Sequence, residues 1–159
     1  VELEQMAEGG DNSGILGLPV AIASASGIEP IGPGASETMT VTVEDVTDAM
    51  LSVATMLVNT NDAFTGLNAR SLADMAVGDS WTTTARVYDA GTEANSEAAG
   101  SIPGPIDGGT GFDEVRDDTD FVSLHPGVVS MDDGLSTSIL GVAHRFDNPA
   151  VRIRVTRTE

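Results

Sequence analysis

The clearest pattern of hydrophobic and polar positions lies in residues 37–44. Met39, Val41 and Val43 alternate there with threonines, and a period of two residues predicts a strand with one buried face. A second alternation, in residues 80–88, predicts another strand of the same kind. These two alternating segments therefore indicate a protein built from β-strands.

Further strands are predicted from apolar runs that end at turn residues. Residues 50–58 form a continuous apolar run, which predicts a central strand covered on both faces. Three more strands are expected in the C-terminal part of the chain, at residues 121–124, 138–146 and 149–157. The last strand should turn its valines and isoleucine inward and its arginines outward, where we expect the arginines to pair with acids: Arg152, Arg154 and Arg157.

Helical and irregular segments complete the prediction. Residues 1–8 place Leu3, Met6 and Ala7 at helical spacing before two glycines, which predicts a short amphipathic helix with a glycine cap. Residues 71–78 are expected to form one turn of helix. Residues 15–31 are expected to be irregular with at most one short strand, and the Gly-, Pro- and acid-rich residues 95–120 to form a long loop.

These elements predict an all-β protein, an antiparallel β-sandwich with one short N-terminal helix and long loops. The 159 residues are enough for one hydrophobic core, and no internal repeat suggests a second. We therefore expect residues 1–159 to form a single sandwich domain.

Charge narrows the choice of partners. The chain has 25 acids against 7 bases, all of them arginine, and a formal net charge of −18. Such a surface repels nucleic acid and anionic membranes, so we expect no nucleic-acid partner. Because concentrated salt screens self-repulsion, the acid excess favours a halophilic or marine extracellular protein. An acidic surface protein that binds divalent cations is the alternative.

Cysteine and hydropathy bear on location. The chain has no cysteine, which excludes disulfides and thiolate metal sites but does not decide the compartment. No apolar run reaches membrane-spanning length, so membrane insertion is not expected. No basic segment followed by an apolar one is present either. We expect an extracellular or cell-surface protein whose export signal has already been removed.

Three acids stand where predicted strands run into loops. Asp62 follows residues 50–58 in an Asn-Asp pair, and Asp89 and Glu93 follow residues 80–88. If they converge, each pair of carboxylates about 5 Å apart costs roughly 3 kcal/mol at an effective dielectric near 20. A divalent cation removes that cost, and Ca²⁺ suits carboxylate and carbonyl oxygens best. The alternative is ordinary turn chemistry, because Asn, Asp and Gly favour turns.

The same residues carry a resemblance to a known family. The segment from 56 to 67, then Asp89-Ala90-Gly91-Thr92-Glu93, then residues 102–105 with the sequence Ile-Pro-Gly-Pro, resembles the spondin domain of F-spondin and mindin and of its bacterial and archaeal relatives. The resemblance implies a β-sandwich like a C2 domain, with Ca²⁺ held between loops at one end. It places the metal-binding acids on Asp62, Asp89 and Glu93, the last being Asp in the animal domains.

One departure from that family suggests self-assembly. Spondin-like sequences have a strand before the helix expected at residues 1–8, and this sequence begins at the helix. A sandwich without an edge strand leaves backbone groups and apolar side chains uncovered, and another chain can supply the strand. The sequence is therefore a processed fragment, a subunit whose gap is filled by a neighbour, or a chain with a shorter native topology.

Catalysis finds little support. No Gly-x-Ser-x-Gly elbow or lysine-bearing phosphate loop is present, and His125 and His144 lie in a predicted turn and a predicted strand. We expect the single tryptophan, Trp81, to be buried in the core. The sequence predicts a non-enzymatic extracellular structural or adhesive module that binds Ca²⁺. We expect this module to self-associate or to bind a matrix or cell-surface partner. Self-association through edge strands would make it a subunit of a filament. The alternatives are a monomeric secreted domain that binds carbohydrate or protein, and a secreted hydrolase.

Overall fold

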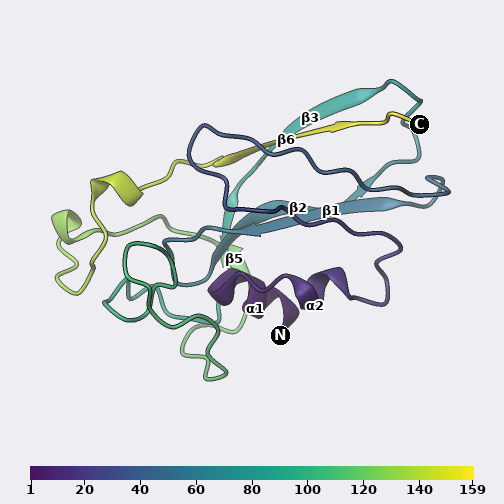
Figure 1. Cartoon of the computed structure of the whole chain (residues 1–159). Coiled ribbons are helices and arrows are strands. Elements are labelled where there is room, and N and C mark those ends of the chain that lie inside the picture. The colour runs from purple at the N-terminus through teal and green to yellow at the C-terminus, as the bar shows by residue number, and fades with distance from the viewer.

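The computed structural model describes residues 1–159 and contains two antiparallel sheets, with two short helices beside the larger one (Figure 1). The larger sheet has the strand order β1-β2-β4-β5, and the smaller one pairs β3 with β6. The strands are β1 (Met50–Met56), β2 (Ala63–Ser71), β3 (Ser80–Ala85), β4 (Val87–Asp89), β5 (Ser123–Leu124) and β6 (Val151–Thr156). Strands are thus the main regular structure, in agreement with the predicted all-β class.

The β1–β2 pair is the longest ladder of the larger sheet. Two residues of β2 lie opposite the single residue Ser52 of β1, which makes a bulge. The Ser52 hydroxyl donates a hydrogen bond to the Asn68 side-chain oxygen at 3.2 Å and accepts one from the Ala69 amide at 3.0 Å. This bond stabilises the left-handed conformation of Ala69, whose φ is 52°.

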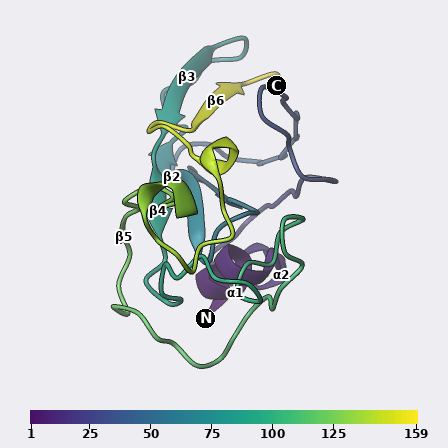
Figure 2. The ribbon, with the colours of Figure 1, turned by 90° about the vertical axis from the view of Figure 1, so that its left-hand side faces the viewer.

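The predicted strand at residues 80–88 is divided between the two sheets. β3 pairs with β6, whereas β4 pairs with β2 and β5, and the chain changes sheet at Arg86. The Arg86 carbonyl accepts a hydrogen bond from the Thr65 hydroxyl, and the Val87 amide donates to the side chain of Asn148. Figure 2 shows the β3–β6 ribbon standing apart from the larger sheet, to which it is connected by this crossing.

The N-terminal helix α1 (Glu2–Gly9) ends as its glycines predict. Gly10 adopts a left-handed conformation with φ 72°, and backbone N–H groups at the cap donate to the carbonyls of Gln5 and Met6. A second short helix, α2 (Ser13–Leu16), follows in a segment expected to be irregular. Both helices lie beside the larger sheet (Figure 1). No helix is long and apolar enough to cross a membrane.

The hydrophobic core is small. Its one cluster of buried residues contains Ile102, Val128 and Leu140, with Ile139 and Phe146 packed against it. The chain exposes 9820 Å² of surface, whereas a monomeric protein of 16.3 kDa exposes roughly 7,500 Å². Large apolar side chains stay exposed to solvent, among them Val20, Ile22 and Ile28.

Three predicted strands differ from the structure. Residues 37–44 form no strand, because no neighbouring backbone pairs with them. The run 50–58 is not central: β1 pairs only with β2 and is half exposed. Residues 138–146 form an isolated bridge from Ser138 to Ala98 and a 3₁₀ turn, η2 (Val142–His144). A second 3₁₀ turn is η1 (Met131–Asp133).

Two smaller predictions are also wrong. Residues 71–78 form hydrogen-bonded turns instead of a helical turn, because β2 extends to Ser71 and the chain must return to β3 at Ser80. Arg152 and Arg154 point outward as expected, but neither forms an ion pair. Arg157 is half-buried, and its guanidinium donates to the carbonyls of Met75 and Glu159.

Substitution of Gly66 tests how closely β1 and β2 pack in the larger sheet. A Cβ at Gly66 would lie 1.8 Å from the Val53 carbonyl oxygen, so no side chain fits unless β1 and β2 separate. We expect Gly66→Ala to lower the free energy of unfolding by more than about 2 kcal/mol. Gly32→Ala is the matched control, because nothing lies within 4 Å of its Cβ position. Urea denaturation measures both, and equal stabilities would contradict the described packing.

Candidate acidic site at the strand ends

Asp62 and Asp89 lie at the ends of neighbouring strands. Asp62 is the residue before β2, and Asp89 is the last residue of β4, directly opposite Ala63 in the β2–β4 register. The Asp62 carbonyl also accepts a hydrogen bond of 3.3 Å from the Ala90 amide. The structure thus brings together the two loops that the sequence places at strand ends.

Asp62 joins the two loops through its side chain. It is fully buried, and its Oδ2 accepts hydrogen bonds from the amides of Thr92 at 2.8 Å and Glu93 at 3.1 Å. The Thr92 hydroxyl also lies 3.3 Å from Oδ2. The other oxygen, Oδ1, is buried without any partner. Burial raises the pKa of Asp62 more than the backbone N–H groups lower it, and the charge of nearby Asp89 raises it further.

Asp89 shapes the loop that follows it. Its Oδ1 accepts a hydrogen bond from the Gly91 amide at 2.8 Å, and its Oδ2 accepts one from the Asn95 side chain at 2.5 Å. Gly91 has φ 74°, and a Cβ there would lie 2.3 Å from the carbonyl oxygen of Phe121. Only glycine fits this position. The Asp-Ala-Gly-Thr-Glu element is therefore a tight turn closed by its own first carboxylate.

Glu93 is the third predicted site residue, and it lies at the same end of the molecule. It is half-buried, and its Oε1 accepts a hydrogen bond from the Asn61 side chain at 2.9 Å. Burial raises the pKa of Glu93 to about 7, and the charges of Glu8, Asp62 and Asp117 act in the same direction. The side chain is thus surrounded by acids and has no basic partner.

Asn61 organises the site although only its neighbour was predicted as a ligand. It is buried, and its amide group donates to Glu93 and to the Ser101 hydroxyl, while its oxygen accepts from the Glu97 amide. A Cβ at Gly104 would lie 2.3 Å from the Val58 carbonyl oxygen, so this glycine allows the 102–105 segment to pack against the same loop. The sequence feature that could have identified Asn61 as a site residue is its position directly before Asp62.

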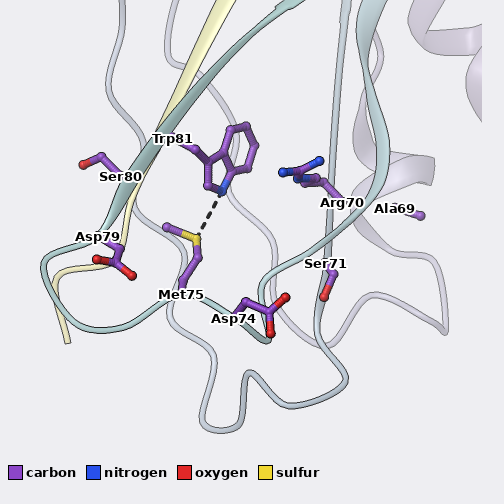
Figure 3. Close-up of a pocket in the computed structure, with 8 residues that line it drawn as sticks. All are labelled: Ala69, Arg70, Ser71, Asp74, Met75, Asp79, Ser80 and Trp81. Atoms are coloured by element: carbon purple, nitrogen blue, oxygen red, sulfur yellow. Dashed lines mark hydrogen bonds between the residues drawn. The ribbon is translucent and has the colours of Figure 1, made fainter.

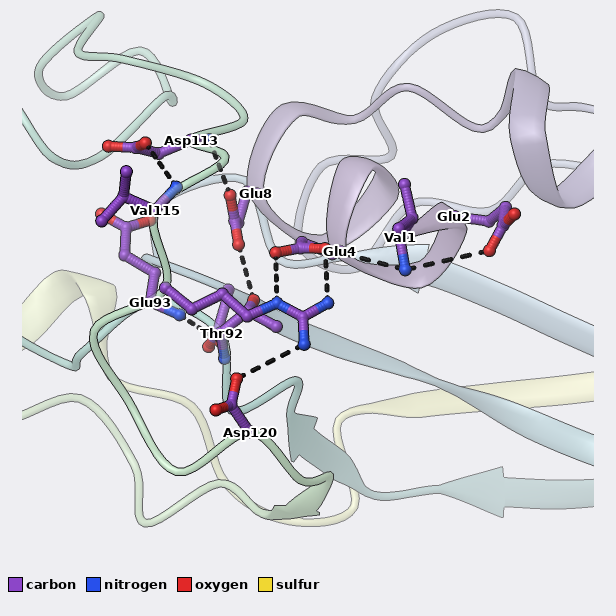
Figure 4. A network of polar contacts seen from close by, with 11 residues as sticks. Val1, Glu2, Glu4, Glu8, Thr92, Glu93, Asp113, Val115 and Asp120 are labelled. Atoms are coloured by element: carbon purple, nitrogen blue, oxygen red, sulfur yellow. Dashed lines mark hydrogen bonds and ion pairs between the residues drawn. The ribbon is translucent and has the colours of Figure 1, made fainter.

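Helix α1 adds a buried carboxylate that the sequence did not reveal. Glu8 is 1% exposed; its oxygens accept from the Thr92 hydroxyl at 2.6 Å and from the Asp113 amide at 2.9 Å (Figure 4). Burial raises the pKa of Glu8. One turn earlier, buried Glu4 pairs with Arg116 at 2.7 Å. Acids four residues apart on a short helix usually face solvent, so no pattern predicts their burial.

His125 is buried beside the site. Its Nδ1 accepts a hydrogen bond from the Gly127 amide, so Nε2 carries the proton of the neutral ring, and Nε2 is buried without a partner. Burial lowers the pKa of His125, while the charge of Asp89 opposes the shift. The ring packs against Phe146 with centroids 5.3 Å apart. In this tautomer neither ring nitrogen offers a free lone pair to a metal ion, because Nδ1 accepts the Gly127 amide and Nε2 carries the proton.

The carboxylates of the site have the chemistry that a hard cation such as Ca²⁺ prefers, but their positions do not form a metal site. Their free oxygens, above all Asp62 Oδ1, are the ligands that Ca²⁺ prefers. Nevertheless, no group of three or more His, Asp or Glu side chains is arranged so that it could hold a metal ion. Much of the ligand capacity of Asp62 and Asp89 is used to hold the loop backbone. A cation would have to draw in the remaining oxygens.

A separate cleft of about 560 Å³ lies where the turn after β2 leads into β3 (Figure 3). Half-buried Trp81 lines it, so the predicted core position of the indole holds only in part. The indole N–H donates to the Met75 sulfur at 3.2 Å, and the Arg70 guanidinium lies 5.3 Å from the ring centroid. The donor and one ring face are therefore already occupied.

Comparison with models of protein families, with curated proteins and with solved structures finds no match to this chain. The resemblance to the spondin domain therefore depends on the motif residues alone.

The acid cluster predicts how stability changes with pH when divalent cations are absent. Raised pKa values mean that the folded chain holds these protons more tightly than the unfolded chain. For Glu93 the resulting stability is present below its ordinary pKa of 4.5 and is lost as pH rises to about 7. We expect the free energy of unfolding to fall by about 2 kcal/mol over this range.

Isosteric variants separate this effect from general charge repulsion. Glu93→Gln should reduce the slope of the pH dependence, because one of the carboxyl groups with a raised pKa no longer titrates. Glu29→Gln removes the same charge from an exposed position without hydrogen bonds and should leave the slope unchanged. Thermal melts in chelator at several pH values measure all three proteins. Identical slopes for the two variants would show that Glu93 does not carry the effect.

Proposed function

We propose that this chain is a non-enzymatic extracellular structural or adhesive module whose loop end is organised by Ca²⁺. The observation that carries the proposal is the buried Asp62 carboxylate, which has one oxygen without a partner and acidic neighbours on the adjoining loop. A buried carboxylate oxygen without a hydrogen bond is costly. A cation bound there removes both the desolvation cost and the repulsion.

The proposed ligands are Asp62, Asp89 and Glu93. Asp62 would contribute Oδ1, and Glu93 would contribute the oxygen that Asn61 does not contact. Ca²⁺ accepts six to eight oxygen ligands in flexible geometry, so carbonyl oxygens and water can complete the site. The family resemblance supports the same ligands and a C2-like sandwich. The charge of −18 supports an extracellular setting rich in salt.

A non-enzymatic role is supported by the surroundings of the histidines. The Nδ1 atoms of His125 and His144 accept backbone N–H groups, and neither ring hydrogen-bonds to a serine or a carboxylate. Hydrolytic triads require such contacts on both sides of the imidazole. The cleft at Trp81 gives no specific support to the sugar-binding alternative, because Arg70 and Met75 already engage the indole.

Calcium dependence of thermal stability tests the site. Binding to the folded state alone should stabilise the protein by about 2.7 kcal/mol when free Ca²⁺ is roughly 100 times its Kd. Asp89→Asn should abolish most of this gain, and Asp132→Asn, which removes an exposed acid, should retain it. Melting curves with Ca²⁺ and with chelator give the comparison. A chelator that leaves the melting temperature of the unaltered protein unchanged would exclude the site.

We further propose that the module self-associates. The specific observation is its surface, which is about 2,300 Å² larger than expected for a monomer of its mass. A stable interface buries about 800 Å² on each partner, so this excess can supply more than one interface per chain. A subunit with two interfaces can extend into a filament.

Sedimentation velocity measures this self-association directly. We expect the mean sedimentation coefficient to rise with protein concentration over about a hundredfold range, in salt high enough to screen the negative charge. Negative-stain microscopy of the largest species should show fibres. A single species with the sedimentation coefficient of a monomer throughout would rule out self-association.

A further inference from the structure

Residues 38–44, the donor segment, have the pattern of a strand but no strand partner. None of their backbone groups takes part in a hydrogen bond, and the segment runs without an arrow after α2 (Figure 1). Met39 and Val41 are 46% and 41% exposed. β-branched residues alternating with Met favour an extended strand with one covered face. The segment is therefore suited to join a sheet that the chain itself does not provide.

Strand β6 offers an unpaired edge. It pairs with β3 on one side, and no other segment hydrogen-bonds to its backbone. Val151, Ile153 and Val155 are half-buried on one face of β6, while the residues between them are exposed on the other. A two-stranded sheet is marginal by itself, and a third strand with an apolar face stabilises it.

β6 is the strand that carries two exposed arginines without an ion pair, whereas Arg70 and Arg86, also exposed and without an ion pair, stand singly elsewhere. Two of only seven basic residues, Arg152 and Arg154, are exposed on this strand and form no ion pair. In the donor segment, Glu44 lies on the threonine face and alternates away from Met39. Antiparallel or parallel addition can thus place apolar residues beside apolar ones and Glu44 on the arginine face.

The free edge of β1 fits the donor less well. β1 contains no charged residue, so it offers nothing complementary to the acidic end of the segment. Nor does the donor pair with β6 of its own chain, although both are present in the same molecule. The Glu37 carboxylate, next to the donor, instead accepts the Ile28 amide at 2.9 Å and holds that end of the segment against residues 27–28.

We propose that residues 38–44 of one copy add as a strand to the free edge of β6 in a second copy. The contact extends the β3–β6 sheet to three strands and covers Met39 and Val41. It is heterologous, because the donor and the acceptor are different surfaces, so repetition from copy to copy builds a chain of subunits. The inference depends on the self-association proposed above and specifies which segments make the contact.

Cross-linking between two single-cysteine proteins tests the contact. The chain has no native cysteine, so Val41→Cys and Ile153→Cys each introduce a unique thiol. A bismaleimide spanning about 8 Å reaches direct and diagonal neighbours on adjacent strands. In an equal mixture with Ca²⁺ and about 0.5 M KCl, we expect a covalent heterodimer that neither variant forms alone at comparable yield.

A matched control uses Val20→Cys, because Val20 is an exposed valine outside both segments. Mixed with Ile153→Cys, it should give at least about fivefold less heterodimer than Val41→Cys if the contact is specific. Equal yields from the two mixtures, in a protein that still sediments as oligomers, would overturn the proposed contact and leave self-association standing. A protein that remains monomeric would overturn both.

Charge reversal provides a second measure that does not require cross-linking. The double variant Arg152→Glu and Arg154→Glu should weaken self-association at least about tenfold, because like charges on adjacent strands repel. Adding Glu44→Arg to this variant should recover most of the loss. Failure of Glu44→Arg to restore association, with circular dichroism unchanged, would contradict the pairing. Reversal of exposed Glu29 by Glu29→Arg is the control and should not restore it.

Discussion

The loop end of this molecule depends on one buried carboxylate. Asp62 is fully enclosed, one of its oxygens holds the backbone of the adjoining loop at Thr92 and Glu93, and the other has no partner. The neighbouring buried acids, Asp89 and Glu8, are occupied by backbone and hydroxyl donors rather than by bases. Burial and like charge therefore act together to raise the pKa values of Asp62, Glu8 and Glu93, so the folded chain favours their protonated forms.

The rest of the molecule contributes little to offset that cost. The core cluster contains only Ile102, Val128 and Leu140 as buried members, and the ion pair of Arg116 with Glu4 fixes helix α1 rather than the acid cluster. Long segments have no regular structure, above all residues 17–49. The acid cluster is the basis of the proposed cation site, and the uncovered apolar surface is the basis of the proposed self-association.

Local sequence patterns predicted correctly those strands that find a pairing strand in the folded chain. The run at residue 50, the alternation at residue 80 and the final strand all appear as strands, and the glycines after α1 end that helix. The proximity of Asp62 to Asp89 was also predictable, because each stands at a junction between a strand and a loop. By contrast, β2 begins within a segment whose Asn, Asp and Gly are typical of turns, and its bulge at Ala69 depends on Ser52 across the ladder.

Other features follow from tertiary contacts that no local pattern encodes. Glu8 is buried because Thr92 and the Asp113 amide, more than eighty residues away, satisfy it. Residues 37–44 have a stronger strand pattern than β5, yet they lack a partner in this chain. The division of residues 80–88 between two sheets depends on Asn148, whose side chain accepts the Val87 amide at the crossing. Hydrogen bonding to a neighbouring segment thus decides whether a segment with strand propensity forms a strand.

Calorimetric titration with Ca²⁺ at pH 6.5, in two buffers of different ionisation enthalpy, tests the central claim most directly. Glu93, with a pKa of about 7, is then mostly protonated, so binding should release at least about half a proton per chain. The apparent binding enthalpies should differ between the buffers in proportion to that release. No heat of binding, or binding with equal enthalpies in both buffers, would contradict the account of a buried acid cluster that a cation neutralises.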